Sequence, residues 1–204
     1  MSTARKRLAA AERRAQLMEV GRAVFAETGF EAASLEVIAH RAGVTKPIIY
    51  EHFGGKEGLH AAIVEREMDE LVTRVSHAIA QGSPRERFEG AVLTFMTYAE
   101  EEPAGFAVLT REAPMPAREG MTRIIDHLTD RIGAVFSREL ARAGYDRKVA
   151  PLYATALLGM VTQVGRWWAA EGKRFSRDQV VSHVAALGWM GLRHLPKKPA
   201  RVGR

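Results

Sequence analysis

The stretch that decides the fold of the N-terminal part of the chain is Ser34-Leu-Glu-Val-Ile-Ala-His-Arg-Ala-Gly-Val-Thr-Lys-Pro-Ile-Ile-Tyr-Glu-His-Phe53. Ser34 is a candidate helix N-cap, because its hydroxyl can accept a hydrogen bond from a free backbone N–H of the first turn. Gly43 falls where that helix must end, since a residue without Cβ adopts the left-handed C-cap conformation at little steric cost. Thr45 and Pro47 suit the start of a second helix, where the missing proline N–H has no helical partner in any case. The stretch therefore predicts a helix-turn-helix.

The faces of the second helix can be sorted at roughly 100° per residue. Ile49 and Phe53 share one face, which we expect to face the protein core. The face opposite the core carries three side chains, which are those of Pro47, Ile48 and Glu51. The two edges between these faces carry polar side chains, namely Lys46 and Tyr50 on one edge and His52 on the other. The helix is thus expected to point an apolar and acidic strip outward between two polar rims.

This arrangement matches the chemistry of a DNA major groove. Polar rims suit the two phosphate strands that border the groove, and the strip between them suits base edges. Ile48 could touch a thymine methyl group, and Glu51 could accept a hydrogen bond from a cytosine amino group. Lys56 stands where the next helix starts, so that a cation combines with free backbone N–H groups as a phosphate site.

From about residue 15 to residue 71 the chain resembles the TetR family of transcriptional regulators. The resemblance rests on short motifs at fixed spacing, which are Gly29-Phe30, Ile38-Ala39, Ala42-Gly43-Val44, Ile49-Tyr50, His52-Phe53 and Gly55-Lys56-Glu57. It implies that six residues face DNA, namely Thr45, Lys46, Pro47, Tyr50, His52 and Lys56. Adding Ile48 and Glu51, which face outward on the second helix, and Ser34, the cap of the first helix, completes the prediction. The predicted DNA-binding residues are Ser34, Thr45, Lys46, Pro47, Ile48, Tyr50, Glu51, His52 and Lys56. Ile48 departs from the small or hydroxylated residue that the family more often has, which leaves the base sequence open. The alternative is that Tyr50 and His52 merely cover the small N-terminal core.

Composition is compatible with this prediction. A chain of 204 residues, 47% of them hydrophobic, can form one or two domains with a real core. It has no cysteine, which excludes disulfides and cysteine-ligated metal and makes a reducing cytoplasm the natural setting. The first residues lack the apolar core of a signal peptide. The longest uncharged span, residues 149–165, falls short of the roughly 20 apolar residues of a membrane-spanning helix.

The net charge of +6 is unevenly distributed. Residues 1–58 hold 9 basic and 7 acidic residues, residues 59–192 hold 16 and 17, and residues 193–204 hold 5 and none. We therefore expect a basic N-terminal arm over residues 1–13 and a basic tail over residues 196–204. Such ends are commonly solvated and disordered, but Arg5, Lys6 and Arg7 could also reach DNA phosphates or the minor groove.

The rest of the chain has a helical rhythm and no convincing strand-like alternation. Apolar residues recur at helical spacing over six segments, which are residues 59–75, 88–101, 106–109, 121–140, 146–170 and 176–194. Gln81-Gly-Ser-Pro84 and the proline-rich residues 112–119 interrupt them. The sequence predicts an all-α protein of about nine helices. Residues 14–72 would form a DNA-binding domain and residues 73–195 a helical regulatory and dimerisation domain.

The last two helices have the composition of an interface. Small residues that permit close helix approach alternate there with large apolar ones, and the family resemblance implies a homodimer through these helices. The candidate interface residues are Leu157, Val184, Leu187, Gly188 and Gly191. A two-fold pair would read a palindrome with half-sites about one helical turn apart. Packing within one chain remains the alternative.

The resemblance also suggests a cavity for a small molecule. The candidate lining residues are Phe95, Phe106, Leu109, Met121, Ile125, Phe136, Met160, Gln163 and Trp167. Each of them also fits an ordinary core position. Their apolar character favours a lipophilic ligand, which would shift the spacing of the two recognition helices and weaken operator binding.

Enzyme signatures are missing from the sequence. There is no His-Glu-x-x-His pair, and Glu57-Gly-Leu-His60 lacks the partners that a helical di-iron site needs. No glycine loop for phosphates is present, and we expect neither a cofactor nor a metal. The sequence therefore predicts a sequence-specific transcriptional regulator, a repressor released from a palindromic operator by a small ligand. The alternative is a basic helical protein that binds DNA without sequence preference or serves as an adaptor.

Overall fold

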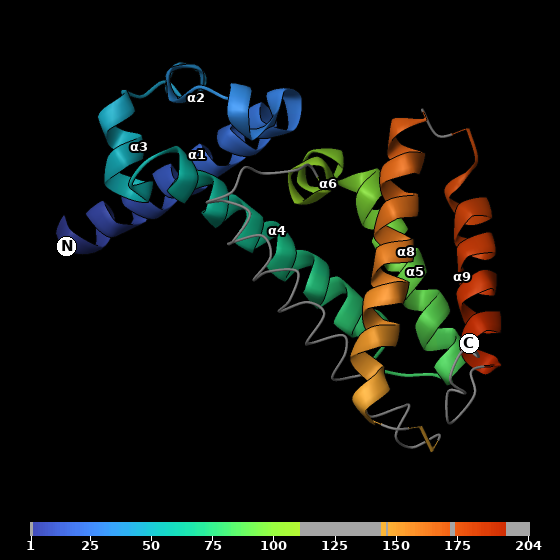
Figure 1. Cartoon of the computed structure of the whole chain (residues 1–204). Coiled ribbons are helices and arrows are strands. Elements are labelled where there is room, and N and C mark those ends of the chain that lie inside the picture. The colour runs from blue at the N-terminus through green and yellow to red at the C-terminus, as the bar shows by residue number, and fades with distance from the viewer. Residues whose placement is uncertain (1, 111–143, 146, 172–173, 195–204) are drawn as a thin grey trace. The chain divides into compact units, whose positions relative to one another are not determined.

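The computed structural model describes residues 2–110, 144–145, 147–171 and 174–194. Within these ranges the chain forms eight α-helices and one short 3-10 helix, with no strand (Figure 1). The all-α class with about nine helices is thereby confirmed. The described residues fall into two compact units, which are residues 2–69 with 102–110, and residues 70–101 with those from 144 to 194.

The first unit begins with α1 (Ser2–Ala32), which buries Leu17 and Phe25. Gly29 interrupts this helix with a φ of 78°, a value that glycine tolerates because it has no Cβ. The two short helices predicted from the sequence follow, as α2 (Leu35–Arg41) and α3 (Lys46–Phe53). Gly43, with a φ of 63°, makes the turn between them.

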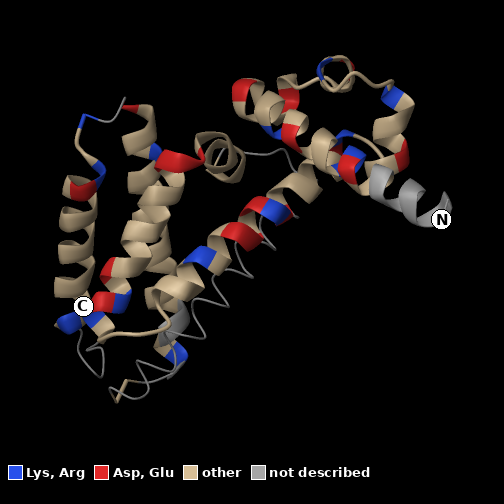
Figure 2. Cartoon of the chain, turned by 180° about the vertical axis from the view of Figure 1, so that it is seen from behind, with Lys and Arg blue, Asp and Glu red and all other residues tan. Residues whose placement is uncertain are grey.

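The first unit is completed by the start of α4 (Lys56–Ala78) and by α6 (Pro103–Thr110), which packs against α1. α1 and α4 approach closely at Gly21, where an added Cβ would lie 3.0 Å from Ile63 Cδ1 and 3.1 Å from Leu59 Cδ2. Lysines, arginines and acidic residues are interspersed along α4 (Figure 2). The core of this unit is therefore apolar, while its helices expose mixed charge.

The second unit contains the rest of α4, α5 (Pro84–Glu101), a 3-10 turn (Arg147–Val149), α8 (Ala150–Ala170) and α9 (Arg177–Arg193). α5 packs against both α8 and α9, and the three helices lie side by side (Figure 1). Val92 and Met96 on α5 are almost completely buried, as are Ala154 and Trp168 on α8. Ser176 and Gln179 form a reciprocal capping box that starts α9.

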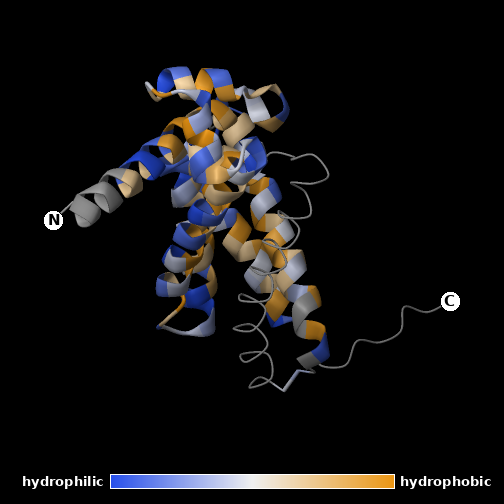
Figure 3. Ribbon diagram, turned by 90° about the vertical axis from the view of Figure 1, so that its left-hand side faces the viewer, coloured by the Kyte–Doolittle hydropathy of each residue, from blue (hydrophilic) through white to orange (hydrophobic). Residues whose placement is uncertain are grey.

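The helices have the amphipathic pattern from which they were predicted. Hydrophobic and hydrophilic segments alternate along the described helices (Figure 3). No helix in the described ranges combines the length and hydropathy that a membrane span requires.

The predicted domain bounds stay predictions. In the structure α1 extends back to Ser2 and so includes residues 2–13 of the predicted basic arm. Residues 102–110 cluster with the first unit, although they lie within the predicted regulatory segment of residues 73–195. The helical stripe at residues 121–140, the prolines of residues 112–119 and the basic tail of residues 196–204 lie outside the described residues.

Candidate nucleic-acid interface

The turn between α2 and α3 is fixed by local hydrogen bonds. Ser34 caps α2 by accepting a hydrogen bond from the backbone N–H of Glu36 at 3.1 Å. Thr45 occupies the N-cap position of α3 without a side-chain hydrogen bond to the helix, and Pro47 lies in its first turn. Gly54 ends α3 in the left-handed conformation, with a φ of 75°. In the turn itself, the backbone N–H of Gly43 donates to the carbonyl of His40 at 3.1 Å, and that of Val44 donates to the carbonyl of Ala39 at 3.0 Å.

The faces of α3 are arranged as the helical periodicity predicts. Ile49 is completely buried, whereas Pro47 and Glu51 are exposed and Ile48 is partly exposed. Tyr50 is 52% exposed. An outward strip of Pro47, Ile48 and Glu51 therefore lies opposite an apolar anchor.

The inner end of α3 is less buried than we expected. Phe53 is only partly buried, and the Arg14 guanidinium lies over its ring, 4.7 Å from the centroid. His52, on the adjoining edge, is also partly exposed. A cation from α1 thus covers the face of Phe53 in place of apolar side chains.

Two of the predicted DNA-facing side chains share one acidic partner. Lys46 Nζ forms an ion pair with Glu36 Oε1, and the Ser34 hydroxyl donates to Glu36 Oε2 at 2.7 Å. The hydrogen bond from Lys46, followed by that from Ser34, lowers the pKa of Glu36 to about 2. The hydrogen bond to Glu36 in turn raises the pKa of Lys46. Glu36 was not among the predicted site residues, because it lies on a different helix from Lys46 and no periodicity links the two.

Lys56 has a structural contact that the sequence did not indicate. Its ammonium donates to the backbone carbonyls of Glu31 at 3.0 Å and Ala33 at 2.9 Å. It also lies 4.6 Å from the centroid of the Phe30 ring. In this conformation the ammonium ties the start of α4 to the end of α1, so its expected phosphate contact remains a prediction.

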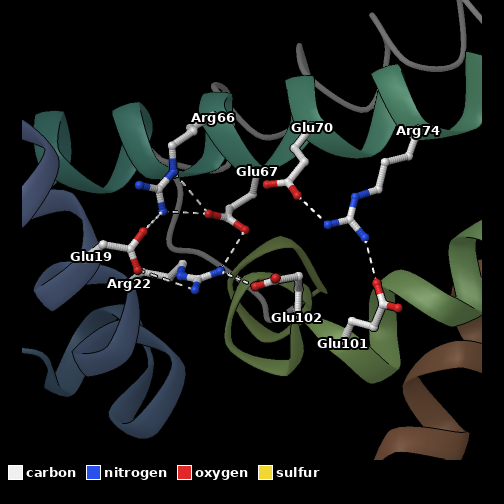
Figure 4. A network of polar contacts seen from close by, with 8 residues as sticks. All are labelled: Glu19, Arg22, Arg66, Glu67, Glu70, Arg74, Glu101 and Glu102. Carbon is white, nitrogen blue, oxygen red and sulfur yellow. Dashed lines mark hydrogen bonds and ion pairs between the residues drawn. The ribbon is translucent and has the colours of Figure 1, made fainter.

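A network of charged residues joins three parts of the first unit. Arg22 on α1 contacts Glu102, which directly precedes α6, at 2.8 Å and Glu67 on α4 at 3.2 Å (Figure 4). Arg66 contacts Glu67 and Glu19 on α1, each at 2.7 Å. Glu67 is only 1% exposed. Burial alone would lower the pKa of Arg22, but the hydrogen bond to Glu102 and the charges of Glu67 and Glu19 raise it.

The second unit has its own ion pairs at the same stretch of sequence. Arg74 contacts Glu70 at 2.6 Å and Glu101 at 3.0 Å (Figure 4). Glu101 and Glu102 are neighbours in the chain, yet each pairs with an arginine of a different unit. The described residues contain no group of three or more His, Asp or Glu side chains arranged to hold a metal ion.

The described candidate ligand residues are distributed over both units. Phe106 and Leu109 belong to α6 in the first unit, while Phe95 on α5 and Met160, Gln163 and Trp167 on α8 belong to the second. Phe95 and Phe106 are buried, whereas Gln163 and Trp167 are exposed. The remaining three, Met121, Ile125 and Phe136, lie outside the described residues.

The candidate interface residues divide into two groups. Val184 and Gly188 are buried within the second unit, and a Cβ added to Gly188 would lie 2.4 Å from Phe88 Cζ and 3.1 Å from Met160 Cε. Both residues are thus already buried in the single chain, and their place in a dimer contact stays a prediction. Leu187 is 67% exposed, Gly191 is exposed and Leu157 is partly exposed. Leu152 and Met190, at 66% and 54% exposure, add apolar surface on α8 and α9.

Comparison with known proteins gives matches over both units. Residues 17–63 match the family model described as bacterial regulatory proteins, tetR family, and residues 81–192 match the tetracyclin repressor-like, C-terminal domain. The HTH-type transcriptional activator FasR of Mycolicibacterium smegmatis is 29% identical over 194 residues, which cover 93% of this chain and 87% of that protein. The HTH-type transcriptional repressor KstR2 of Mycobacterium tuberculosis is 29% identical over 102 residues, which cover 50% and 51% of the two chains.

Solved structures share the fold. A TetR-like transcriptional regulator from Rhodococcus sp. RHA1 matches with a TM-score of 0.74 and 26% identity, over 90% of this chain and 97% of that one. The transcriptional regulator FadR of Bacillus subtilis, solved in complex with stearoyl-CoA, matches with a TM-score of 0.75 over 85% and 96% of the two chains. At 16% identity, FadR shows the fold alone. With family matches in both its N-terminal and its C-terminal part, the chain belongs to the TetR family, and it is a helix-turn-helix transcriptional regulator, not an enzyme.

Proposed function

We propose that this regulator binds a palindromic operator as a homodimer, with α3 of each subunit in the major groove. The observation that carries the proposal is the orientation of α3, which buries Ile49 completely and exposes Pro47, Tyr50 and Glu51. A helix of this size with an outward polar and apolar face suits the width of the major groove. The helix is anchored by the buried Ile49 and ends at Gly54, whose backbone N–H donates to the carbonyl of Tyr50.

The side chains divide into two roles under this proposal. Thr45, Lys46, Tyr50 and His52 contact phosphates and set the register, with Ser34 and Lys56 at the flanks. Pro47, Ile48 and Glu51 lie against base edges, where Ile48 suits a thymine methyl and Glu51 a cytosine amino group. Mutation of a phosphate contact should weaken binding to all sequences, whereas mutation of Glu51 should change the preferred base.

Selection of bound duplexes from a random DNA pool tests the proposal. We expect an enriched palindrome whose affinity exceeds that of random duplex by about 10³-fold or more at a fixed salt concentration. A ratio near one would instead favour a basic helical protein that binds DNA without sequence preference. The same selection measures symmetry and half-site spacing.

We place the dimer contact on the exposed apolar side chains of α8 and α9. Leu152, Leu187 and Met190 are more than half exposed in the single chain, and a partner helix that covers them would bury this apolar area. Leu187→Glu should therefore give monomers in sedimentation velocity experiments. Leu93→Glu is the matched control, because Leu93 is 41% exposed on α5; equal sedimentation of both variants with the wild type would exclude this surface.

The effector that we propose is a lipophilic small molecule, with a long-chain acyl-CoA as the first candidate. The apolar candidate residues support a lipophilic ligand, and FadR, which shares the fold, was solved with stearoyl-CoA. Binding would favour one spacing of the two recognition helices and change operator affinity by about 5–150-fold. Titration of stearoyl-CoA and shorter acyl-CoAs into the operator complex tests this; unchanged affinity with every chain length would exclude the class.

The direction of regulation depends on the position of the operator relative to the promoter. FasR is named an activator and KstR2 a repressor, so both outcomes occur among the relatives. We propose repression, in which an operator overlapping the promoter blocks transcription. A transcription assay on the selected operator, placed over and upstream of a promoter, distinguishes repression from activation.

The proposed location is the cytoplasm, where bacterial DNA is accessible.

A further inference from the structure

Glu36 is an acidic residue on the helix-turn-helix face that we assign to DNA. It is the second residue of α2, and its carboxylate holds both Lys46, through Oε1, and the Ser34 hydroxyl, through Oε2. Both partners belong to the residues predicted to face DNA. One carboxylate therefore occupies polar groups that a phosphate would otherwise contact.

The ion pair links the start of α2 to the start of α3 and is open to water. The side chain of Glu36 is 66% exposed and that of Lys46 is 42% exposed. The pair holds Glu36 ionised far into the acid range, since the hydrogen bonds from Lys46 and Ser34 lower its pKa to about 2. Exposed pairs of this kind contribute little net stability and exchange partners readily.

Lys46 is the one lysine or arginine in the sequence of α3. Three other cations of this unit have contacts of their own: Arg14 lies over the Phe53 ring, Arg41 pairs with Glu27 at 2.8 Å, and Lys56 donates to two backbone carbonyls. Glu36 thus neutralises the permanent positive charge of the recognition helix in the free protein. DNA phosphates compete for that same ammonium.

We propose that Glu36 is an internal substitute for a DNA phosphate, which holds Lys46 in the free protein and releases it to the DNA backbone on binding. The proposal rests on the proposed function. Two consequences follow: Glu36 lowers the affinity for every DNA sequence, and it reduces the salt dependence of binding. The salt dependence is reduced because the Glu36 carboxylate takes up cations from solution once Lys46 has moved to a DNA phosphate, and this uptake offsets part of the counterion release from DNA.

Four forms of the full chain test this inference: wild type, Glu36→Gln, Lys46→Gln and the double variant. Glutamine keeps the length of the side chain and an oxygen that can accept from Ser34, so the cap of α2 is preserved. Affinity is measured by fluorescence anisotropy with a selected duplex and a random duplex at several KCl concentrations. Thermal unfolding of each form verifies that it is folded.

We expect Glu36→Gln to bind both duplexes about three- to fivefold more tightly at low salt. The slope of log K against log salt should become steeper by up to about 0.9, as for one additional phosphate contact. The gain should shrink to less than about twofold in the Lys46→Gln background, since the two side chains act as a pair. Glu65→Gln on α4 is the control for net charge, because Glu65 is exposed and lies outside α2 and α3.

Three results would overturn the inference while leaving DNA binding intact. They are unchanged or weaker binding by Glu36→Gln, an equal gain in the Lys46→Gln background, and an equal gain from Glu65→Gln. An equal gain in the Lys46→Gln background would mean that Glu36 acts only by electrostatic repulsion of DNA and not through Lys46. If no form binds any duplex at low salt, the proposed function itself fails, and the inference fails with it.

Discussion

His60 on α4 is a buried histidine whose neighbours are two aromatic rings of α1. It is 6% exposed, and its ring centroid lies 5.0 Å from that of Phe25 and 4.9 Å from that of Phe30, both edge-on. Burial, followed by the charge of Lys56, lowers the pKa of His60 to about 4. The imidazole is therefore neutral at pH 7 and serves as an aromatic packing residue.

The lowered pKa of His60 predicts acid sensitivity of the DNA-binding unit. The unfolded chain binds this proton near pH 6.5 and the folded chain only near pH 4. The contribution of neutral His60 to the free energy of unfolding is therefore complete above about pH 6.5 and is lost as the pH falls toward 4. The limiting slope is about 1.4 kcal/mol per pH unit. Chemical denaturation at pH 7 and pH 5 should show this loss in the wild type and a smaller loss in His60→Phe. Equal losses would mean that other groups cause the acid sensitivity.

At the scale of single residues, the sequence predicted what depends on neighbours within a few positions. The cap at Ser34, the turn at Gly43 and the buried side of α3 at Ile49 all follow from helix geometry, and the structure confirms them. The pairing of Glu36 with Lys46 and the tie between Lys56 and the carbonyls of α1 could not be predicted. Both depend on how separate helices pack, and helical periodicity carries no information about that.

At the scale of elements, Gly188 determines how closely α9 lies to α5. A Cβ at this position would lie 2.4 Å from Phe88 Cζ and 2.7 Å from Phe88 Cε1. Real Cβ atoms do not approach other atoms so closely, so either the phenyl ring or the helix must move. Gly159 on α8 offers a contrast, since an added Cβ there would meet nothing within 4 Å.

We expect Gly188→Ala to lower the free energy of unfolding by about 1–3 kcal/mol through overpacking. Gly159→Ala should be neutral or raise it by up to about 1 kcal/mol, because alanine favours helix more than glycine does. Denaturation followed by circular dichroism measures both at the same protein concentration. Equal stability of the two variants would show that α9 adjusts its position without cost.

Helices α4, α5, α8 and α9 were largely predictable, because apolar residues recur along each of them at helical spacing. The break at Gln81-Gly-Ser-Pro84 precedes α5, which starts at Pro84, and the last predicted segment matches α9 within one residue at each end. Which apolar side of α9 faces its own chain was not predictable. Gly188 and Leu187 are adjacent in sequence, yet the first packs on Phe88 and the second is 67% exposed.

At the scale of the whole molecule, the division of the chain differs from the simple order of its sequence. α6 follows α5 after the single residue Glu102, but it belongs to the first unit, where it packs on α1. Helical periodicity could not predict this, because Glu102 pairs with Arg22, which lies 80 residues earlier in the chain. Along α4, the first unit ends at Asp69, and the predicted domain boundary at residue 72 stays a prediction.

We expect the ion pair between Arg22 and Glu102 to hold the start of α6 against α1. Glu102→Gln removes its charge, while Arg22 keeps Glu67 at 3.2 Å and Glu19 at 3.4 Å, so α1 and α4 stay joined. We therefore expect faster amide hydrogen exchange in α6, with the exchange of α9 unchanged. Glu101→Gln is the matched control, because Glu101 pairs with Arg74 in the second unit; its effect should be confined to the ends of α4 and α5 that this pair joins. If both variants loosen α6 equally, the consecutive carboxylates do not act on separate units, and the docking of α6 rests on its apolar side chains alone.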